Sequence, residues 1–258
     1  MNAVPLSRPQ SGFEGLRGTL REHLPLAPFT SWRVGGPALR YYQPADRDDL
    51  ITFVRQLPAA EPVLWLGLGS NLLVRDGGWP GTVIHLHGAL DRLSVPATGD
   101  GAPVVAEAGV HCARLAKQVR AGALAGLGFM AGIPGTVGGF VRMNGGAYGR
   151  EVSDVLIDCD VILPGGRLVT LPAADLRYTY RHSALPDAAV VVRARFQGEP
   201  GDPATIGAKM DEIGEHLGRE MTAEIFEVNT STHYGRMVRV DDDTVILFGD
   251  MNEVMEYI

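Results

Sequence analysis

The chain has 258 residues, of which 45% are hydrophobic and 21% are charged, a balance typical of globular proteins. Its formal net charge of -7 argues against a nucleic-acid partner or an anionic-membrane surface, because both need a concentrated positive field. The two cysteines are too few for a disulfide framework or a cysteine metal site. No signal core or apolar run of ~18 residues is present, so we expect a soluble, cytoplasmic protein without membrane insertion. The small number of cysteines also leads us to expect no metal.

The first half of the chain predicts one amphipathic helix and two strands. Residues Asp46 to Leu57 place apolar side chains at helical spacing behind a plausible N-cap, Asp46. The short apolar runs Val63–Leu66 and Val83–Leu86 are bounded by Pro and Gly, as strands are. A glycine-rich loop lies between these two strands.

The middle of the chain alternates strands with a second helix. We expect a strand at Val104–Ala108 and a helix at Cys112–Ala121, which Gly122 ends. The segment Val161–Thr170 reads as a hairpin around Pro164-Gly165-Gly166, and Ala189–Phe196 reads as one more strand. The class is therefore α+β.

A further helix is predicted to open at Asp202-Pro203, the position where helices tolerate proline best. Its apolar face carries Ile206, Met210, Ile213 and Leu217. Beyond it, segments 236–240 and 244–248 read as a strand pair closed by an acidic turn, and 250–258 reads as a helix. This tail is too short for an independent domain of the usual ~50 residues or more, so we expect it to pack on the preceding body.

The loop Gly67-Leu68-Gly69-Ser70-Asn71-Leu72 follows a predicted strand. Closely spaced glycines allow backbone N–H groups to face an anion, and the Ser and Asn side chains add donors. Such a loop can bind phosphate, but a tight strand-to-strand turn explains the spacing equally well.

A second glycine-rich stretch runs from Ala131 to Gly149. Neither stretch completes the phosphate loop of nucleotide hydrolases or the G-x-G-x-x-G fingerprint of Rossmann folds. The remaining functional interpretation is a dinucleotide held by several loops. The alternative is a glycine-rich core crossover, which explains one such run more easily than two.

Four ordered segments together resemble the signature segments of the UDP-N-acetylenolpyruvoylglucosamine reductase family. They are Thr30–Ala38, Gly67–Val74, Ala131–Gly149 and Tyr180–Ser183. The resemblance covers roughly residues 20 to 218. It implies a vanillyl-alcohol-oxidase-like FAD-binding fold made of two α+β subdomains, with a short atypical C-terminal segment. On this basis we predict subdomains at residues 1–88 and 89–200, and a C-terminal helix with an atypical remnant or replacement of the substrate domain at 201–258.

The resemblance also implies a reaction of peptidoglycan precursor synthesis. In the family NADPH reduces the flavin, which then delivers hydride to the enolpyruvyl group of a UDP-sugar, giving UDP-N-acetylmuramate. Arg181 matches the catalytic arginine, a permanent planar cation suited to the substrate carboxylate, and Tyr180 is a candidate substrate residue. A surface arginine and a core tyrosine are the structural alternatives. The expected FAD-binding residues are Gly67, Gly69, Ser70, Asn71, Leu72, Gly132, Ile133, Pro134, Gly135, Thr136, Gly138, Gly139, Asn144, Gly146 and Ala147.

Histidines give two further expectations. Wider relatives of this fold attach FAD through a histidine in the first glycine loop, and this loop has none, so we expect non-covalent FAD. His85 and His87 would share one face of a strand, but without a third ligand nearby they read as ordinary strand residues.

The family pattern fails at the C-terminal end. The Gly-Ser-x-Phe-(Lys/Arg)-Asn-Pro segment that carries the family's proton-donor serine is missing, and residue type alone does not assign its role to Ser231, nor that of the terminal acid to Glu253 or Glu256. Three functions therefore stay open: a reductase of the family, an FAD-binding protein that lost this reaction and serves as a scaffold or partner-binding module, and a flavin oxidase.

Overall fold

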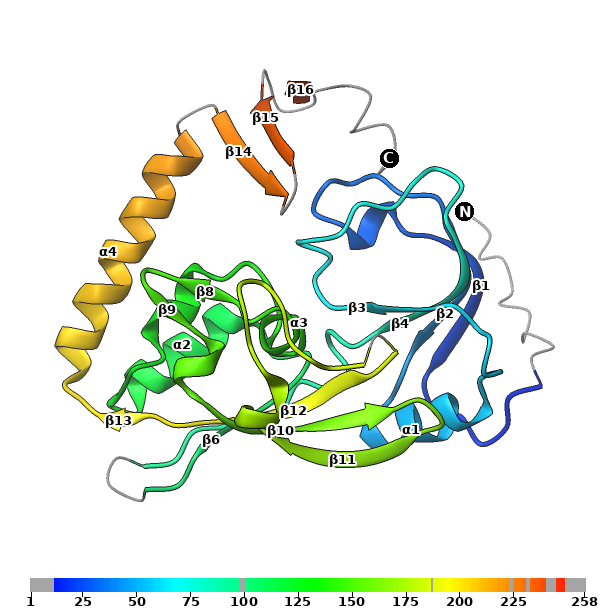
Figure 1. The fold of residues 1–258 in the computed structure, drawn as a ribbon, viewed down its shortest axis with the longest axis horizontal. Helices are drawn as coiled ribbons and strands as arrows, with labels where there is room; N and C mark the ends of the chain where they lie inside the picture. The colour runs from blue at the N-terminus through cyan, green and yellow to red at the C-terminus, as the bar shows by residue number, and fades with distance from the viewer. Residues whose placement is uncertain are drawn as a thin grey trace, which may run out of the picture.

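The computed structural model describes residues 12–97, 101–186, 188–222, 225–230, 233–239 and 245–248. Figure 1 shows a body built around two β-sheets, with helix α4 standing along one side and the strands β14 to β16 following it. Within the described residues, no helix is long and apolar enough to cross a bilayer.

The first sheet has four strands in the order β1-β2-β4-β3. β1 pairs antiparallel with β2, whereas β4 runs parallel to both β2 and β3. Its strands are β1 (Thr19–Pro25), β2 (Pro37–Gln43), β3 (Val63–Leu66) and β4 (Trp79–His85). The strand predicted at Val63–Leu66 is confirmed.

The strand predicted at Val83–Leu86 is longer than expected at its start and ends one residue earlier, at His85. The Pro80-Gly81 pair was interpreted as a boundary, but it lies inside β4. A Cβ on Gly81 would lie 2.1 Å from the Pro62 carbonyl oxygen, so this glycine is needed for close approach of the neighbouring chain.

Helix α1 (Arg47–Gln56) confirms the first predicted helix. The Asp46 carboxylate accepts the backbone N–H of Asp49 at 2.9 Å, which satisfies one of the free N–H groups at the helix start. Leu50, Phe53 and Val54 are buried, as their spacing predicts.

The second sheet has five strands in the order β11-β10-β12-β6-β5, and all its pairs are antiparallel. The predicted hairpin is confirmed, with Leu163 opposite Arg167 across the turn. The strands predicted at Val104–Ala108 and Ala189–Phe196 are also present, each shorter by one residue. The strands are β5 (Leu93–Ser94), β6 (Val104–Glu107), β10 (Leu156–Leu163), β11 (Arg167–Pro172) and β12 (Val190–Phe196).

Helices α2 (Cys112–Ala121) and α3 (Val137–Arg142) pack with the second sheet in one buried cluster, which includes Leu115, Val141 and Phe196. The prediction for α2 is confirmed at both ends. His111 precedes it and accepts the N–H of Ala113 at 3.1 Å through Nδ1.

A separate buried cluster joins the two sheets. Tyr42 of β2, Phe53 of α1 and Ile84 of β4 pack in it with Ile162 of β10 and Val192 of β12. The Tyr42 and Phe53 rings stack with their centroids 4.0 Å apart. This continuous core fixes the loops of one sheet relative to those of the other. The subdomain boundaries near residues 88 and 200 stay predictions.

Short elements connect the larger strands and helices. They are η1 (Ala27–Phe29), β7 (Leu124–Ala125), η2 (Gly128–Gly132), β8 (Gly146–Ala147), β9 (Arg150–Glu151), η3 (Val152–Asp154), η4 (Ala173–Leu176) and β13 (Glu199–Pro200). β8 pairs with β9, and β13 pairs with β7.

Helix α4 (Pro203–Thr222) opens where the sequence predicts. The Asp202 carboxylate accepts the N–H of Thr205 at 2.8 Å, and Ile206 and Ile213 are buried. Met210 packs against the cluster of the second sheet, so the first turns of α4 belong to the body.

The C-terminal strands are β14 (Ile225–Thr230), β15 (His233–Arg239) and β16 (Val245–Phe248). β15 and β16 confirm the predicted strand pair, with Arg239 opposite Val245. β14 adds a third, antiparallel strand. The side chain of Leu217 and the helix predicted at 250–258 lie outside what the structure describes.

Candidate functional site

The two glycine-rich loops meet in the structure. The first leaves β3 and the second leads into α3, and the Ser70 hydroxyl donates a hydrogen bond to the Pro134 carbonyl oxygen. A Cβ on Gly67 would lie 2.6 Å from the Thr136 hydroxyl oxygen, so the loops are also in van der Waals contact. Segments far apart in sequence thus form one continuous wall.

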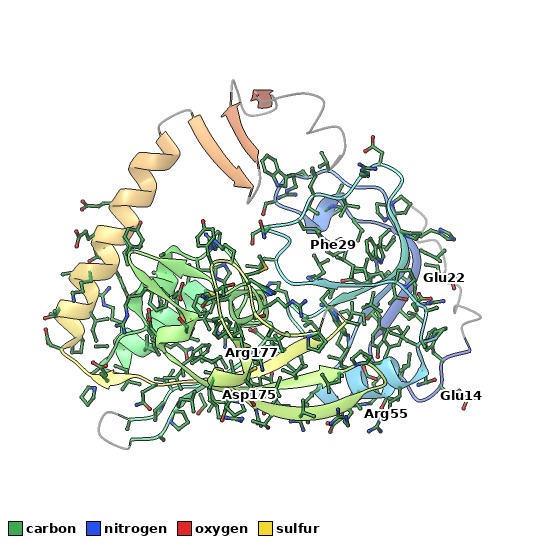
Figure 2. The ribbon with its side chains drawn as sticks, viewed as in Figure 1. Glu14, Glu22, Phe29, Arg55, Asp175 and Arg177 are labelled. Atoms are coloured by element: carbon green, nitrogen blue, oxygen red, sulfur yellow. The ribbon has the colours of Figure 1, made fainter. Side chains whose placement is uncertain are left out.

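The glycines of this wall have two different surroundings. A Cβ on Gly69 would lie 2.0 Å from the Phe29 carbonyl oxygen, and a Cβ on Gly138 would lie 2.9 Å from the Ala108 Cβ. These two glycines are required by packing, and Figure 2 shows Phe29 in the first-sheet half of the molecule. At Gly139 an added Cβ meets nothing within 4 Å, and at Gly135 it meets only Ser70 Oγ at 3.6 Å. The wall therefore has an open face where backbone lies uncovered.

Several backbone N–H groups of the second loop are already bonded inside the protein. The N–H of Val137 donates to Val110, and that of Gly138 donates to Ala108, both at 2.9 Å. Gly135 likewise donates to Ile133 at 3.0 Å. Gly135 and Gly138 thus act through their missing Cβ rather than as donors. What the open face offers a ligand is space, because glycine has no side chain to prevent close approach to the backbone.

A cavity of about 430 Å³ adjoins the first loop. It is lined by Pro28, Phe29, Thr30, Ser31, Arg33, Gly67, Leu68, His85 and His87. Both histidines line this cavity, but His87 lies beyond β4, which ends at His85, so the two do not share a face of one strand as predicted. Sequence reasoning did not assign Ser31, Arg33 or the histidines to a site. The signal was present, since Ser31 and Arg33 belong to the Thr30–Ala38 segment.

His85 connects the first glycine loop to the sheet beneath it. Its Nε2 lies 2.9 Å from the Gly67 carbonyl oxygen, which can only accept, so Nε2 carries the proton. Nδ1 then accepts the Tyr41 hydroxyl at 2.6 Å. Burial lowers the pKa of His85 and raises that of Tyr41 to about 12, which stabilises this arrangement of protons at neutral pH.

A second cavity has a volume of about 480 Å³. It is lined by Asn144, Gly146, Ala147, Gly149, Arg150, Glu151, Asp154, Tyr180 and Arg181. Five residues that the sequence assigned to cofactor, substrate or catalysis therefore share one cavity. Arg150, Glu151 and Asp154 were not anticipated. A hydrogen bond from the Ser153 hydroxyl, followed by one from Asn144, lowers the pKa of Glu151, which keeps it ionised near neutral pH.

Tyr180 and Arg181 form the tip of a tight hairpin. Thr179 and His182 exchange two backbone hydrogen bonds of 3.1 Å across it. Arg181 has a φ of 54°, a left-handed conformation that is rare for a residue with a side chain and that clusters at functional sites. Its guanidinium carbon lies 5.9 Å from the Tyr180 ring centroid. Tyr180 is 74% exposed, so the core alternative for this tyrosine is wrong.

Some predicted residues line neither cavity. Leu72 packs against the core of the first sheet, and Ile133 packs against that of the second. In both glycine-rich loops these apolar side chains face the protein interior. Their assignment to cofactor binding stays a prediction, as does the assignment of all the other residues expected to bind FAD. Within the described residues, no three His, Cys, Asp or Glu side chains gather as a metal site would require.

Two family models match different parts of the chain. The model described as an FAD binding domain matches residues 38–172, which include both glycine loops. The model of the MmoB/DmpM family matches residues 203–248, which include α4 and the three C-terminal strands.

Curated relatives carry the name UDP-N-acetylenolpyruvoylglucosamine reductase. The protein of Erythrobacter litoralis is 58% identical over 202 residues, which are 78% of this chain and 62% of that protein. The protein of Novosphingobium aromaticivorans is 49% identical over 212 residues, covering 82% of this chain and 68% of that protein. The chain thus spans less than two thirds of the first relative and slightly more of the second.

Solved structures agree with these matches. The structure of UDP-N-acetylenolpyruvylglucosamine reductase (MurB) from Thermus caldophilus has a TM-score of 0.65 and 30% identity, covering 79% of this chain and 70% of that one. Cholesterol oxidase from Brevibacterium sterolicum, at a TM-score of 0.55 and 14% identity, shares the fold alone. The predicted α+β, vanillyl-alcohol-oxidase-like FAD-binding fold is confirmed. The matched domain, the identities and the shared fold together place this chain in the UDP-N-acetylenolpyruvoylglucosamine reductase family.

Proposed function

We propose that the chain binds FAD non-covalently and uses NADPH to reduce the enolpyruvyl group of UDP-N-acetylglucosamine enolpyruvate, giving UDP-N-acetylmuramate for peptidoglycan synthesis. The observation that carries this proposal is the meeting of Ser70 with Pro134, which joins the two glycine loops inside the segment matched as an FAD binding domain. The names of the relatives support the substrate.

The open face at Gly135 and Gly139 would hold the diphosphate, because backbone there is uncovered and a side chain would fill the space. FAD supplies the hydride chemistry when it is bound. The protein's part is to hold the cofactor, exclude water and orient the substrate.

Arg181 would bind the substrate carboxylate, whose charge rises as the enolpyruvyl double bond is reduced. Its support is its position at an exposed hairpin tip on the cavity shared with Asn144 and Ala147. A guanidinium stays protonated throughout the working pH range and pairs with carboxylates through two parallel hydrogen bonds. A cytoplasmic location is part of the same proposal.

The test uses the purified full chain loaded with FAD. Bleaching of the flavin band near about 450 nm by NADPH, followed by its return when the enolpyruvyl sugar nucleotide is added without oxygen, is the expected result. A colourless protein that stays colourless with added FAD would refute cofactor binding. Bleaching without substrate-dependent return would refute the reductase reaction.

A second candidate function is an FAD-binding protein of the same fold that has lost the reductase reaction, and what favours it is that residues 203–248 match a different family model from the flavin-binding body. Here the chain binds FAD but carries, after its flavin-binding body, a C-terminal segment that binds a partner. The packing of Ile206, Met210 and Ile213 onto the body would couple such a segment to the flavin-binding part. Flavin that NADPH reduces and that the sugar nucleotide does not reoxidise would favour this candidate. Fast reoxidation by oxygen instead would indicate an oxidase.

A further inference from the structure

Asn144 is one of the residues that the sequence analysis assigned to the cofactor, but its contacts differ from those of the glycines around it. Its side chain is 2% exposed, and both ends of its amide are engaged. The Nδ2 group donates to the Thr179 carbonyl oxygen at 3.2 Å, and Oδ1 accepts the Ser153 N–H at 3.2 Å. These contacts lead to the walls of the second cavity rather than to the open face of the glycine loops.

Thr179 is the base of the hairpin that presents Arg181. Its carbonyl oxygen accepts both the His182 N–H across the hairpin and the Asn144 amide. Arg181 lies two residues further along, in a left-handed conformation that its surroundings must impose, because it costs a non-glycine residue free energy. The Asn144 amide is therefore one of the contacts that fix where the guanidinium points.

Two more side chains attach the same hairpin to the end of α3. The Tyr178 hydroxyl donates to the Val141 carbonyl oxygen at 3.0 Å, and the Ser183 hydroxyl donates to the Arg142 carbonyl oxygen at 2.6 Å. The three anchors thus connect the hairpin to Val141 and Arg142 at the end of α3 and to Asn144 just beyond it. That helix begins at the second glycine loop, so it joins the flavin-binding wall to the hairpin.

We propose that Asn144 is a positioning residue for Arg181, holding the hairpin across the second cavity at a fixed distance from the glycine loops. This inference rests on the proposed function, in which Arg181 binds the substrate. Asn144 has a left-handed φ of 45°, a conformation that asparagine adopts more readily than most residues, which gives a reason for an asparagine at this position. A misplacement of a reacting group by about 1 Å costs on the order of 100-fold in rate, so the anchor matters for turnover.

The experiment compares Asn144→Gly with Ser183→Ala in the full chain. Glycine removes the amide but accepts the backbone conformation of Asn144, and Ser183 is a buried anchor that lines neither cavity. We expect both variants to bind FAD with unchanged affinity and to be reduced by NADPH at the wild-type rate. Reoxidation by the enolpyruvyl sugar nucleotide should slow about 10- to 100-fold in Asn144→Gly and less in Ser183→Ala.

The outcomes separate this role from a cofactor contact. Weaker FAD binding in Asn144→Gly with wild-type behaviour of Ser183→Ala would overturn the inference in favour of a cofactor ligand. If the wild type itself is not reoxidised by the sugar nucleotide, the proposed function fails, and hydrogen exchange of the 176–184 segment then decides. Faster exchange in both variants supports the anchoring, and unchanged exchange overturns it.

Discussion

The Ser70 hydroxyl donates a hydrogen bond to the Pro134 carbonyl oxygen, although 64 positions separate the two residues in sequence. The bond joins the loop after β3 of the first sheet to the loop before α3 of the second sheet. The bond between Ser70 and Pro134 joins the two glycine-rich loops into one continuous wall.

Removal of this junction should loosen the wall. In Ser70→Ala we expect FAD to bind about 2- to 10-fold more weakly, since a typical hydrogen bond contributes ~0.5–1.5 kcal/mol. The measurement is a fluorescence titration of the apoprotein with FAD. Ser94→Ala, on the short edge strand β5, is the matched control and should bind FAD like the wild type. Equal affinity of all three proteins would show that the junction does not support binding.

Two neighbouring glycines should respond in opposite ways to the same substitution. Gly138→Ala places a Cβ 2.9 Å from that of Ala108 and should lower the free energy of unfolding by ~1–3 kcal/mol. Gly139→Ala meets no atom within 4 Å and should leave the apoprotein as stable or raise its stability by ~0.5–1 kcal/mol, because alanine favours the helix.

Gly139→Ala should also affect the binding of FAD. Because the space beside Gly139 is where we place the cofactor, Gly139→Ala should weaken FAD binding while the apoprotein stays intact. Urea denaturation of the apoprotein and an FAD titration give the two numbers. Unchanged FAD affinity in Gly139→Ala would move the cofactor away from this face.

Stability should depend on pH through His85. Burial lowers its folded-state pKa below the usual value of about 6.5, so the unfolded chain takes up the proton more readily. The stabilisation from His85 is therefore complete above about pH 6.5 and is lost as the pH falls below it. His85→Phe, which leaves the Tyr41 hydroxyl and the Gly67 carbonyl without this partner, should cost ~1–3 kcal/mol at pH 7.5.

The comparison of wild type and His85→Phe at several pH values isolates this residue from the other histidines. The difference in unfolding free energy, measured by urea denaturation, should shrink between pH 7.5 and pH 5. A difference that stays constant over this range would contradict the lowered pKa.

Substitution of Arg181 should separate turnover from folding. Arg181→Lys loses the planar fork of the guanidinium, and we expect reoxidation by the sugar nucleotide to fall by ~100- to 1,000-fold while reduction by NADPH is retained. Arg181→Gly keeps the left-handed backbone conformation, which glycine adopts without strain. The variant should therefore be as stable as the wild type or up to ~1 kcal/mol more stable. Stopped-flow absorbance and thermal unfolding give the two readouts. A large loss of stability in Arg181→Gly would indicate a structural role.

Local patterns predicted the secondary structure well where one strong signal was enough. The cap at Asp46, the stop at Gly122 and the turn at Gly165-Gly166 each place an end of an element within one residue. The pattern failed at Pro80-Gly81, because the close approach of Pro62 that allows a strand there comes from a neighbouring segment. A rule based on composition cannot detect such a contact.

The candidate site was also only partly predictable from local patterns. The motifs identified the glycine loops, Tyr180 and Arg181, and the matched relatives agree with the family they indicated. They did not identify His85, whose role depends on Tyr41 and Gly67 on separate segments. They also did not show that Leu72 and Ile133, both partly buried, pack against the cores of different sheets.

The sequence by itself determined the α+β class, the glycines that allow close backbone approach, and a permanent cation at position 181. These properties depend on periodicity and on the chemistry of single residues. Only the tertiary structure decided that Ser70 meets Pro134 and that the Asn144 amide bonds to Thr179 at the base of the Arg181 hairpin. Such contacts depend on how the core shared by the two sheets sets the relative position of their loops, and this follows from packing of the whole chain rather than from any segment of it.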